Sequence, residues 1–169
     1  MAYITGNTKQ HIQGSVIEDF IFKEMKENGY DVYIKIPEKM KMNIEKNIIK
    51  LLNTHTFDFF MIENEKFFVV EVKSKRINFS KDDRKIDISN NQERVFEKLR
   101  KRGINCKMVV VWFFEEGYNY NIFEYEKLSM IGIKKRKIKL PKEINYSPER
   151  VKYNKFPKKI IRNMKEFTS

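Results

Sequence analysis

The seven residues from Met108 to Phe114 are all apolar, and this run constrains the fold of the 169-residue chain more than any other segment. A strand without polar positions is typical of a sheet that is covered on both faces. Two segments with apolar stripes at helical spacing, residues 8–28 and 90–102, can supply the covering layers. The sequence therefore predicts an α/β fold in which helices pack against a central sheet.

Shorter segments predict the strands that join this central one. Residues 30–36 have the alternation of a strand, and residues 57–62 and 67–73 are rich in aromatic and β-branched side chains. The last two segments are separated by four polar residues, which predicts a hairpin. We expect residues 38–55 to form an excursion with a short helix, and residues 120–125 to form one more short strand. The expected core order is helix, strand, strand, strand, helix, strand.

Positive charge is concentrated at the end of the chain. The net charge is +12, and residues 134–169 hold thirteen Lys and Arg residues but only three acids. We therefore divide the chain into a core domain, residues 1–133, and a basic C-terminal extension, residues 134–169, which is an arm or a part of the same domain. A charge of this sign favours an anionic partner, either nucleic acid or an acidic membrane surface, over a solvated lysine-rich surface without a partner.

The basic extension has two interpretations. Its side chains can lie along a phosphate backbone, with Tyr146, Tyr153 and Phe156 available to stack on bases or sugars. Alternatively, the extension packs on its own domain or on a second subunit. The sequence favours contact with the backbone but leaves both alternatives open.

The single cysteine, Cys106, excludes an intrachain disulfide and a cysteine-based metal site. Because it lies in an apolar run, we expect a buried free thiol. This cysteine usage fits an intracellular, cytoplasmic protein. Residues 1–13 contain no apolar signal segment, and no stretch approaches the roughly 18 apolar residues that span a bilayer. We expect no membrane partner and no small-molecule cofactor.

The predicted hairpin brings three charged residues together. If residues 64–65 form a two-residue loop, Asp58 lies directly opposite Glu71, with Cβ atoms about 4.5–5.5 Å apart. Lys73 lies two residues further along the strand and therefore on the same face. The other face is expected to be apolar and to include Phe57.

Two carboxylates buried side by side are costly unless a cation neutralises them. A divalent ion such as Mg²⁺ prefers oxygen ligands and stabilises charge on a phosphate, and a neighbouring lysine can hold or deprotonate an attacking water. These residue types therefore match phosphodiester hydrolysis. The alternative is a surface hairpin with an ordinary Glu–Lys pair, because such pairs are common in a chain with 34% charged residues.

This combination of residues resembles the PD-(D/E)xK nuclease superfamily, which includes restriction endonucleases and archaeal Holliday-junction resolvases. Asp58 matches the first part of the motif, and Glu71 and Lys73 match the second part. The sequence departs from the motif at Phe57, where its name has Pro. The resemblance covers roughly residues 8–114 and implies a restriction-endonuclease-like core, which is a central mixed sheet flanked by helices in the order α-β-β-β-α-β.

The resemblance also implies roles for these residues. Asp58, Glu71 and the backbone carbonyl of Val72 are expected to bind Mg²⁺ or Mn²⁺, and Lys73 is expected to act on the attacking water.

Two further candidate catalytic residues have structural alternatives. Glu18 matches a glutamate that many members carry on the first helix, but it forms a capping box with Ser15 if that helix starts late. Gln92 matches a glutamine that some members carry at the start of the second helix, and a capping box with Ser89 explains it without catalysis.

The implied function is metal-dependent endonucleolytic cleavage of DNA. The lack of a separate recognition domain favours a structure-specific enzyme such as a junction resolvase, whereas the long excursion at residues 38–55 leaves this assignment open. Such enzymes are often symmetric homodimers, although the sequence shows no dimer surface. The alternatives are a non-catalytic nucleic-acid-binding module and a protein-interaction or membrane-surface protein. The residues expected to contact nucleic acid are Lys75, Arg76, Lys134, Lys135, Arg136 and Lys137.

Overall fold

The computed structural model describes residues 6–54, 57–76, 85–114, 117–127, 129–131, 137–139 and 153–166. The helices are α1 (Gly6–Glu27), α2 (Glu38–Lys41), α3 (Lys46–Thr54), α4 (Asn90–Lys101) and α5 (Lys158–Glu166), with a 3-10 turn η1 (Tyr125–Lys127). The strands are β1 (Asp31–Tyr33), β2 (Phe59–Glu63), β3 (Lys66–Arg76), β4 (Lys85–Asp87), β5 (Asn105–Phe114), β6 (Gly117–Glu124), β7 (Ser129–Ile131), β8 (Lys137–Lys139) and β9 (Asn154–Lys155).

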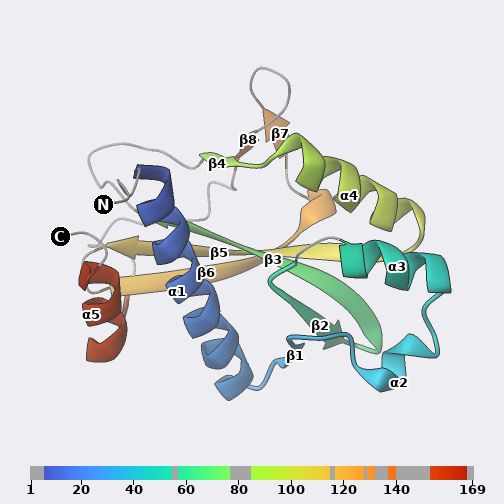
Figure 1. Cartoon of the computed structure of the whole chain (residues 1–169), viewed down its shortest axis with the longest axis horizontal. Coiled ribbons are helices and arrows are strands. Elements are labelled where there is room, and N and C mark those ends of the chain that lie inside the picture. The colour runs from blue at the N-terminus through green and yellow to red at the C-terminus, as the bar shows by residue number, and fades with distance from the viewer. Residues whose placement is uncertain are drawn as a thin grey trace, which may run out of the picture.

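A six-stranded mixed sheet forms the centre of the molecule, with the strand order β1-β2-β3-β5-β6-β9 (Figure 1). The strands β3 and β5 are parallel, and the other neighbours are antiparallel. The expected core order is present as α1, β1, β2, β3, α4 and β5. This arrangement confirms the predicted fold class and the core that the resemblance implies.

The apolar strand β5 is buried on both faces, as its sequence predicts. Val109 and Val111 belong to the core that includes the apolar stripe of α1, and Val110 and Trp112 belong to the core that includes α3 and α4. Each of these four side chains is at most 2% exposed. The free thiol of Cys106 is buried as well, and its burial raises its pKa to about 12.

The segment predicted as a strand over residues 30–36 is shorter than expected. β1 pairs only through three residues with β2, and it lies at the edge of the sheet. Ile34 is 59% exposed, and Ile36 turns into the core beneath α3. The chain leaves the sheet here because the following excursion contains two helices, α2 and α3, rather than the single one expected.

Phe57 lies on the face opposite to the predicted one. Its ring stacks on Phe96 of α4, with ring centroids 6.2 Å apart. The prediction was wrong because β2 begins only at Phe59, so that the alternation of a strand does not extend back to Phe57.

The described part of the basic extension packs on its own domain. β9 pairs with β6, and α5 contacts α1 (Figure 1). Phe156 is only 4% exposed and stacks on Tyr118, so it is not available to stack on a base, and that expectation was wrong. Residues 134–136 and Tyr146 lie outside the described residues.

A small second sheet with the order β4-β8-β7 was not predicted. Each of its strands has three residues, which is too short for a periodic pattern to be visible in the sequence. Among the described residues, no helix has both the length and the apolar character required to cross a membrane.

Candidate active site

The β2–β3 hairpin has the predicted register. Glu63 pairs with Lys66, and the two loop residues between them have positive φ angles of 50° and 63°, as the loop of a tight hairpin requires. β3 has 11 residues and β2 has five, so β3 continues beyond the start of its partner. The last pair of the ladder is Phe59 with Val70. From Glu71 onward, this side of β3 is therefore free of β2.

Asp58 directly precedes β2 and lies beside the part of β3 that has no β2 partner. The backbone N–H of Val72 donates a hydrogen bond of 2.6 Å to Oδ2 of Asp58. In a strand the N–H and the C=O of one residue point to the same neighbour. The Val72 carbonyl therefore also faces the side of β3 on which β2 has ended.

Glu71 and Lys73 lie on the face of the sheet that α4 covers, as the alternation of the strand predicts. Glu71 is only 7% exposed. Nζ of Lys73 lies 3.2 Å from Oε1 of Glu71, and the Lys73 side chain is 24% exposed. The ammonium group thus joins a buried carboxylate to the surface of the molecule.

Gln92 links these two side chains to α4. Its Nε2 donates to Oε1 of Glu71, and its Oε1 accepts a hydrogen bond of 3.1 Å from Nζ of Lys73. The capping box with Ser89 is present too, since the Ser89 hydroxyl accepts from the Gln92 backbone and the Gln92 side chain accepts from the Ser89 N–H. Gln92 therefore forms the capping box and also contacts Glu71 and Lys73, while its catalytic role stays a prediction. The Ser89 N–H and Lys73 are both donors, so Oε1 must face them and Nε2 must face Glu71.

Glu18 reaches the same cluster from α1. It shares a side-chain hydrogen bond with Asp58, and the charges of Asp58 and Glu71 act on it. The alternative capping role with Ser15 was wrong, because α1 begins at Gly6 and Ser15 lies inside the helix. The structure therefore brings together all five residues that the sequence indicates.

Burial dominates the electrostatics of this cluster. It raises the pKa of Glu71 to about 7, with a further contribution from the negative charge of Asp58, against the opposing effects of Lys73 and Gln92. Burial, followed by the Asp58 charge, raises the pKa of Glu18 to about 7. The pKa of Asp58 is also raised by burial, although the Val72 N–H opposes this. Three acids that resist ionisation together form a site that favours a cation.

The donor set fits a hard divalent cation. Within the described part of the chain, no three Asp, Glu, His or Cys side chains are grouped so that they hold a metal ion by themselves. Two carboxylates, Asp58 and Glu71, together with the Val72 carbonyl, match the preference of Mg²⁺, which takes one or two carboxylates and keeps several waters.

The expected nucleic-acid contacts are only partly described. Lys75 and Arg76 lie at the end of β3, just beyond Lys73, and Arg76 is exposed. Lys137 belongs to β8 of the small sheet. The remaining three residues of that prediction, at positions 134–136, are outside the described residues.

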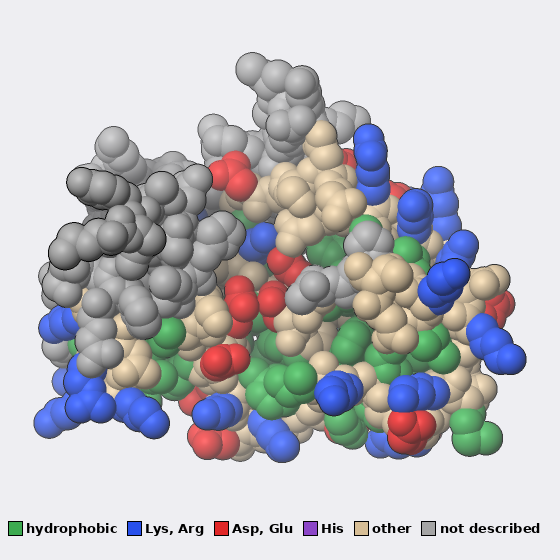
Figure 2. Space-filling model, in the orientation of Figure 1, with side chains coloured by type: hydrophobic (Ala, Val, Ile, Leu, Met, Phe, Trp, Pro, Cys, Tyr) green, Lys and Arg blue, Asp and Glu red, His purple; other side chains and the backbone are tan. Residues whose placement is uncertain are grey.

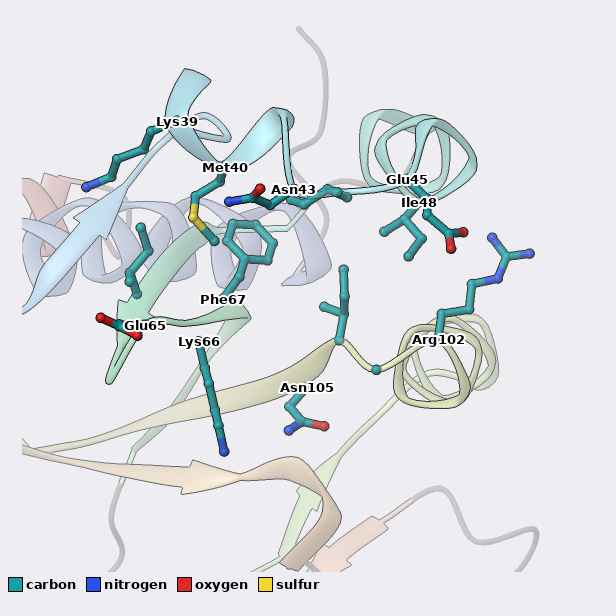
Figure 3. Close-up of a pocket in the computed structure, with 14 residues that line it drawn as sticks. Lys39, Met40, Asn43, Glu45, Ile48, Glu65, Lys66, Phe67, Arg102 and Asn105 are labelled. Carbon is teal, nitrogen blue, oxygen red and sulfur yellow. The ribbon is translucent and has the colours of Figure 1, made fainter.

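A pocket of about 900 Å³ lies at the opposite end of the hairpin (Figure 3). Met40, Ile48, Phe67 and Arg102 are among its lining residues, and the Phe67 ring points toward Met40. Phe67 precedes Glu71 by four residues, which is about 13 Å along a strand. The pocket is therefore separate from the acidic cluster.

We expect Ser89→Ala to lower the free energy of unfolding by about 1 kcal/mol, because it leaves the Gln92 N–H at the helix start without its acceptor. In a domain of this size, that loss lowers Tm by about 2–4 °C. Ser89→Thr keeps the hydroxyl and serves as the control. Equal Tm values for all three proteins in thermal unfolding would show that the cap does not stabilise α4.

We expect Glu18→Gln to stabilise the metal-free protein above neutral pH. The pKa of Glu18 rises from 4.5 to about 7 on folding, so the folded state holds a proton that the unfolded state loses. That stabilisation is complete below pH 4.5 and is lost as the pH rises through about 7. In Glu18→Gln the side-chain amide can donate a hydrogen bond to Asp58 at every pH. We therefore expect the free energy of unfolding of this variant to exceed that of the wild type by on the order of 1 kcal/mol at pH 8, after allowing for solvent screening.

The check is urea unfolding in chelator between pH 5 and pH 8. The stability of the wild type is expected to fall over this range, and that of Glu18→Gln to fall less, with Glu71 causing the remaining slope. Identical slopes for the two proteins would mean that Glu18 does not hold a proton in the folded state.

No family model matches the sequence, and no curated protein matches it either. Among solved structures, the chain is similar to Hjc, a Holliday junction resolvase from the archaeal hyperthermophile Archaeoglobus fulgidus. The sequence identity is 11%, the TM-score is 0.47, and the alignment covers 78% of this chain and 85% of Hjc. At this identity the similarity concerns the backbone arrangement alone.

Proposed function

We propose that this protein is a metal-dependent nuclease of the PD-(D/E)xK type that hydrolyses phosphodiester bonds in DNA. The observation that carries the proposal is the cluster of Asp58, Glu71 and Lys73 where β3 extends beyond β2, with Gln92 bonded to both Glu71 and Lys73. An ordinary surface Glu–Lys pair does not account for it, because Glu71 is buried beside a second carboxylate.

Asp58, Glu71 and the Val72 carbonyl are the residues that would hold Mg²⁺ or Mn²⁺. The ion would supply an activated water and would neutralise charge on the phosphate. The buried acids favour this occupancy, because a divalent cation offsets both the burial of the carboxylates and their mutual repulsion, which raise their pKa values.

The chain's own residues position the reactants. The Lys73 ammonium, partly exposed and next to Glu71, can orient the attacking water or neutralise a phosphate oxygen. Gln92 fixes the direction of the Glu71 carboxylate through its Nε2, and its own orientation is fixed by the start of α4. Glu18 holds Asp58 from the side of α1. These contacts limit the movement of the groups that must meet the phosphate.

Within this class we propose structure-specific cleavage, as in a junction resolvase, and action as an intracellular homodimer. The net charge of +12 supports an anionic partner such as DNA. Two active sites in a symmetric dimer would cut two strands.

The test is a panel of end-labelled substrates with Mg²⁺: linear duplex, single-stranded DNA, single-stranded RNA and a four-way junction. Preferred cutting of the junction supports the structure-specific form, and cutting of all DNA substrates supports a general endonuclease. DNA that is bound but remains intact with Mg²⁺ and with Mn²⁺ would favour the alternative, a non-catalytic nucleic-acid-binding module.

A further inference from the structure

The basic and acidic side chains of α4 are segregated on its two outer flanks. Arg94, Lys98 and Lys101 are spaced by four and three residues, so they lie on one flank of the helix, and all three are exposed. Glu93 and Glu97 lie on the other flank, with Arg100 one turn further along.

The acidic flank is internally paired. Nη2 of Arg100 lies 3.0 Å from Oε2 of Glu97, and both side chains are partly exposed. Glu97 is also three residues after Arg94 and four before Lys101, within reach of both by helical spacing, but it pairs with Arg100 instead. The three cations of the basic flank therefore have no acidic partner on α4.

The like charges of the basic flank are expected to destabilise the helix α4. Arg94 and Lys98 are like charges at the i, i+4 spacing, which destabilise a helix by about 0.2–0.5 kcal/mol. Neither residue, nor Lys101, forms an ion pair with another described residue. The helix dipole accounts for cations in the last turn, but not for Arg94 or for the gathering of all three on one flank.

This flank begins at the end of α4 that contacts the candidate active site, but it lies on the outer side of the helix. Gln92, which contacts Glu71 and Lys73, is two residues before Arg94, and residues two apart in a helix point to opposite sides. At a rise of about 1.5 Å per residue, the row from Arg94 to Lys101 is about 10 Å long and leads away from the site. That length corresponds to about three nucleotide steps of 3.4 Å along one strand.

The neighbouring helix extends the positive surface. Ile48 of α3 and Arg102 at the end of α4 line the same pocket, so the two helices are adjacent there. Lys46 and Lys50 of α3 are exposed and lie one turn apart. Figure 2 shows Lys and Arg side chains gathered on the side of the molecule where α3 and α4 lie.

We propose that Arg94, Lys98 and Lys101 form a row on the outer side of α4 that binds the phosphate backbone of nucleic acid. The row is distinct from Lys75, Arg76 and the C-terminal extension. The inference that the bound nucleic acid is also a substrate rests on the proposed nuclease function. The inference that this row binds nucleic acid does not depend on that function. The row contacts phosphates and therefore sets affinity and direction rather than base sequence.

The experiment measures binding without cleavage. Labelled duplex and four-way-junction DNA are titrated in chelator by fluorescence anisotropy, over a series of salt concentrations. The row variant is Arg94→Ala, Lys98→Ala and Lys101→Ala together. The matched control is Lys23→Ala and Lys26→Ala in α1 with Lys39→Ala in α2, which removes three exposed charges from helices outside the C-terminal extension. Alanine keeps helix propensity in both, and circular dichroism verifies folding.

The row variant is expected to bind at least about tenfold more weakly than the wild type at roughly 0.1 M salt, and its salt slope to fall by about 2–3. The control is expected to stay within about twofold of the wild type. Equal weakening in both variants would mean that only net charge matters, and that result overturns the row. Wild-type affinity in the row variant, or no DNA binding by the wild type, also overturns it. Loss of affinity in the row variant alone supports the row, even if no substrate is ever cleaved.

Discussion

Lys73→Met is expected to lower the rate of DNA cleavage by about 10²- to 10³-fold, which is the range found when one electrostatic contact to a transition state is removed. Lys73 is the cation next to Glu71, at 3.2 Å, and it is partly exposed where a phosphate can approach. Methionine keeps most of the length of the side chain but has neither a charge nor a donor. Oε1 of Gln92 also loses the Lys73 donor, so the variant removes two contacts in one step.

The measurement is single-turnover cleavage of the preferred substrate at saturating protein, together with DNA affinity in chelator. The control is Lys66→Met, on the same strand but at the hairpin, where Lys66 is exposed. We expect loss of cleavage in Lys73→Met with DNA affinity within a few fold of the wild type, and full activity in the control. An active Lys73→Met protein would remove Lys73 from the chemistry.

Phe96→Ala is expected to lower the free energy of unfolding by about 3–5 kcal/mol, as is typical for a large buried ring. Phe96 is 1% exposed and packs edge-on against Tyr125, with ring centroids 4.6 Å apart, and it also stacks on Phe57. The ring holds α4 on the sheet one turn after Gln92. Its removal should therefore weaken the positioning of Gln92 as well as the core.

Urea unfolding measures the loss of stability, and Met42→Ala provides the comparison because Met42 is 90% exposed. A surface change of that kind is expected to stay within about 0.5 kcal/mol. A Phe96→Ala protein as stable as the wild type would show that α4 does not pack against the sheet through this ring.

The parts of the fold that could be predicted are those whose patterns are long enough to be unambiguous. The seven apolar residues of β5 indicate a strand buried on both faces, and the apolar stripes of α1 and α4 indicate the layers that cover it. The register of the β2–β3 hairpin follows from its loop, since a two-residue loop fixes every pair of the ladder.

The parts that could not be predicted depend on contacts far apart in the sequence. β9 has two residues, and it exists because β6 offers a free edge more than thirty residues earlier in the chain. Phe156 lies in a basic segment, where an aromatic ring is expected to be available for stacking on a base, yet it packs between Phe20 and Tyr118. Local composition carries no information about such a space.

The candidate site was predictable to the extent that strand alternation determines it. Glu71 and Lys73 share a face because they are two residues apart in β3. The sequence alone does not distinguish a capping residue from a site residue at Gln92. Its Oε1 in fact accepts hydrogen bonds from both the Ser89 N–H and the Lys73 ammonium. Asp58 was expected as a strand residue opposite Glu71, whereas it precedes β2 and accepts from the Val72 N–H.

The most direct test of the central claim is a cleavage time course that begins in chelator and continues after an excess of Mg²⁺ is added. The wild type and Glu71→Ala are compared on the preferred DNA substrate of the panel. We predict no product before the addition, product formation by the wild type after it, and none by Glu71→Ala. Cleavage by the wild type in chelator, or equal cleavage by both proteins after the addition, would contradict a metal-dependent nuclease centred on Glu71.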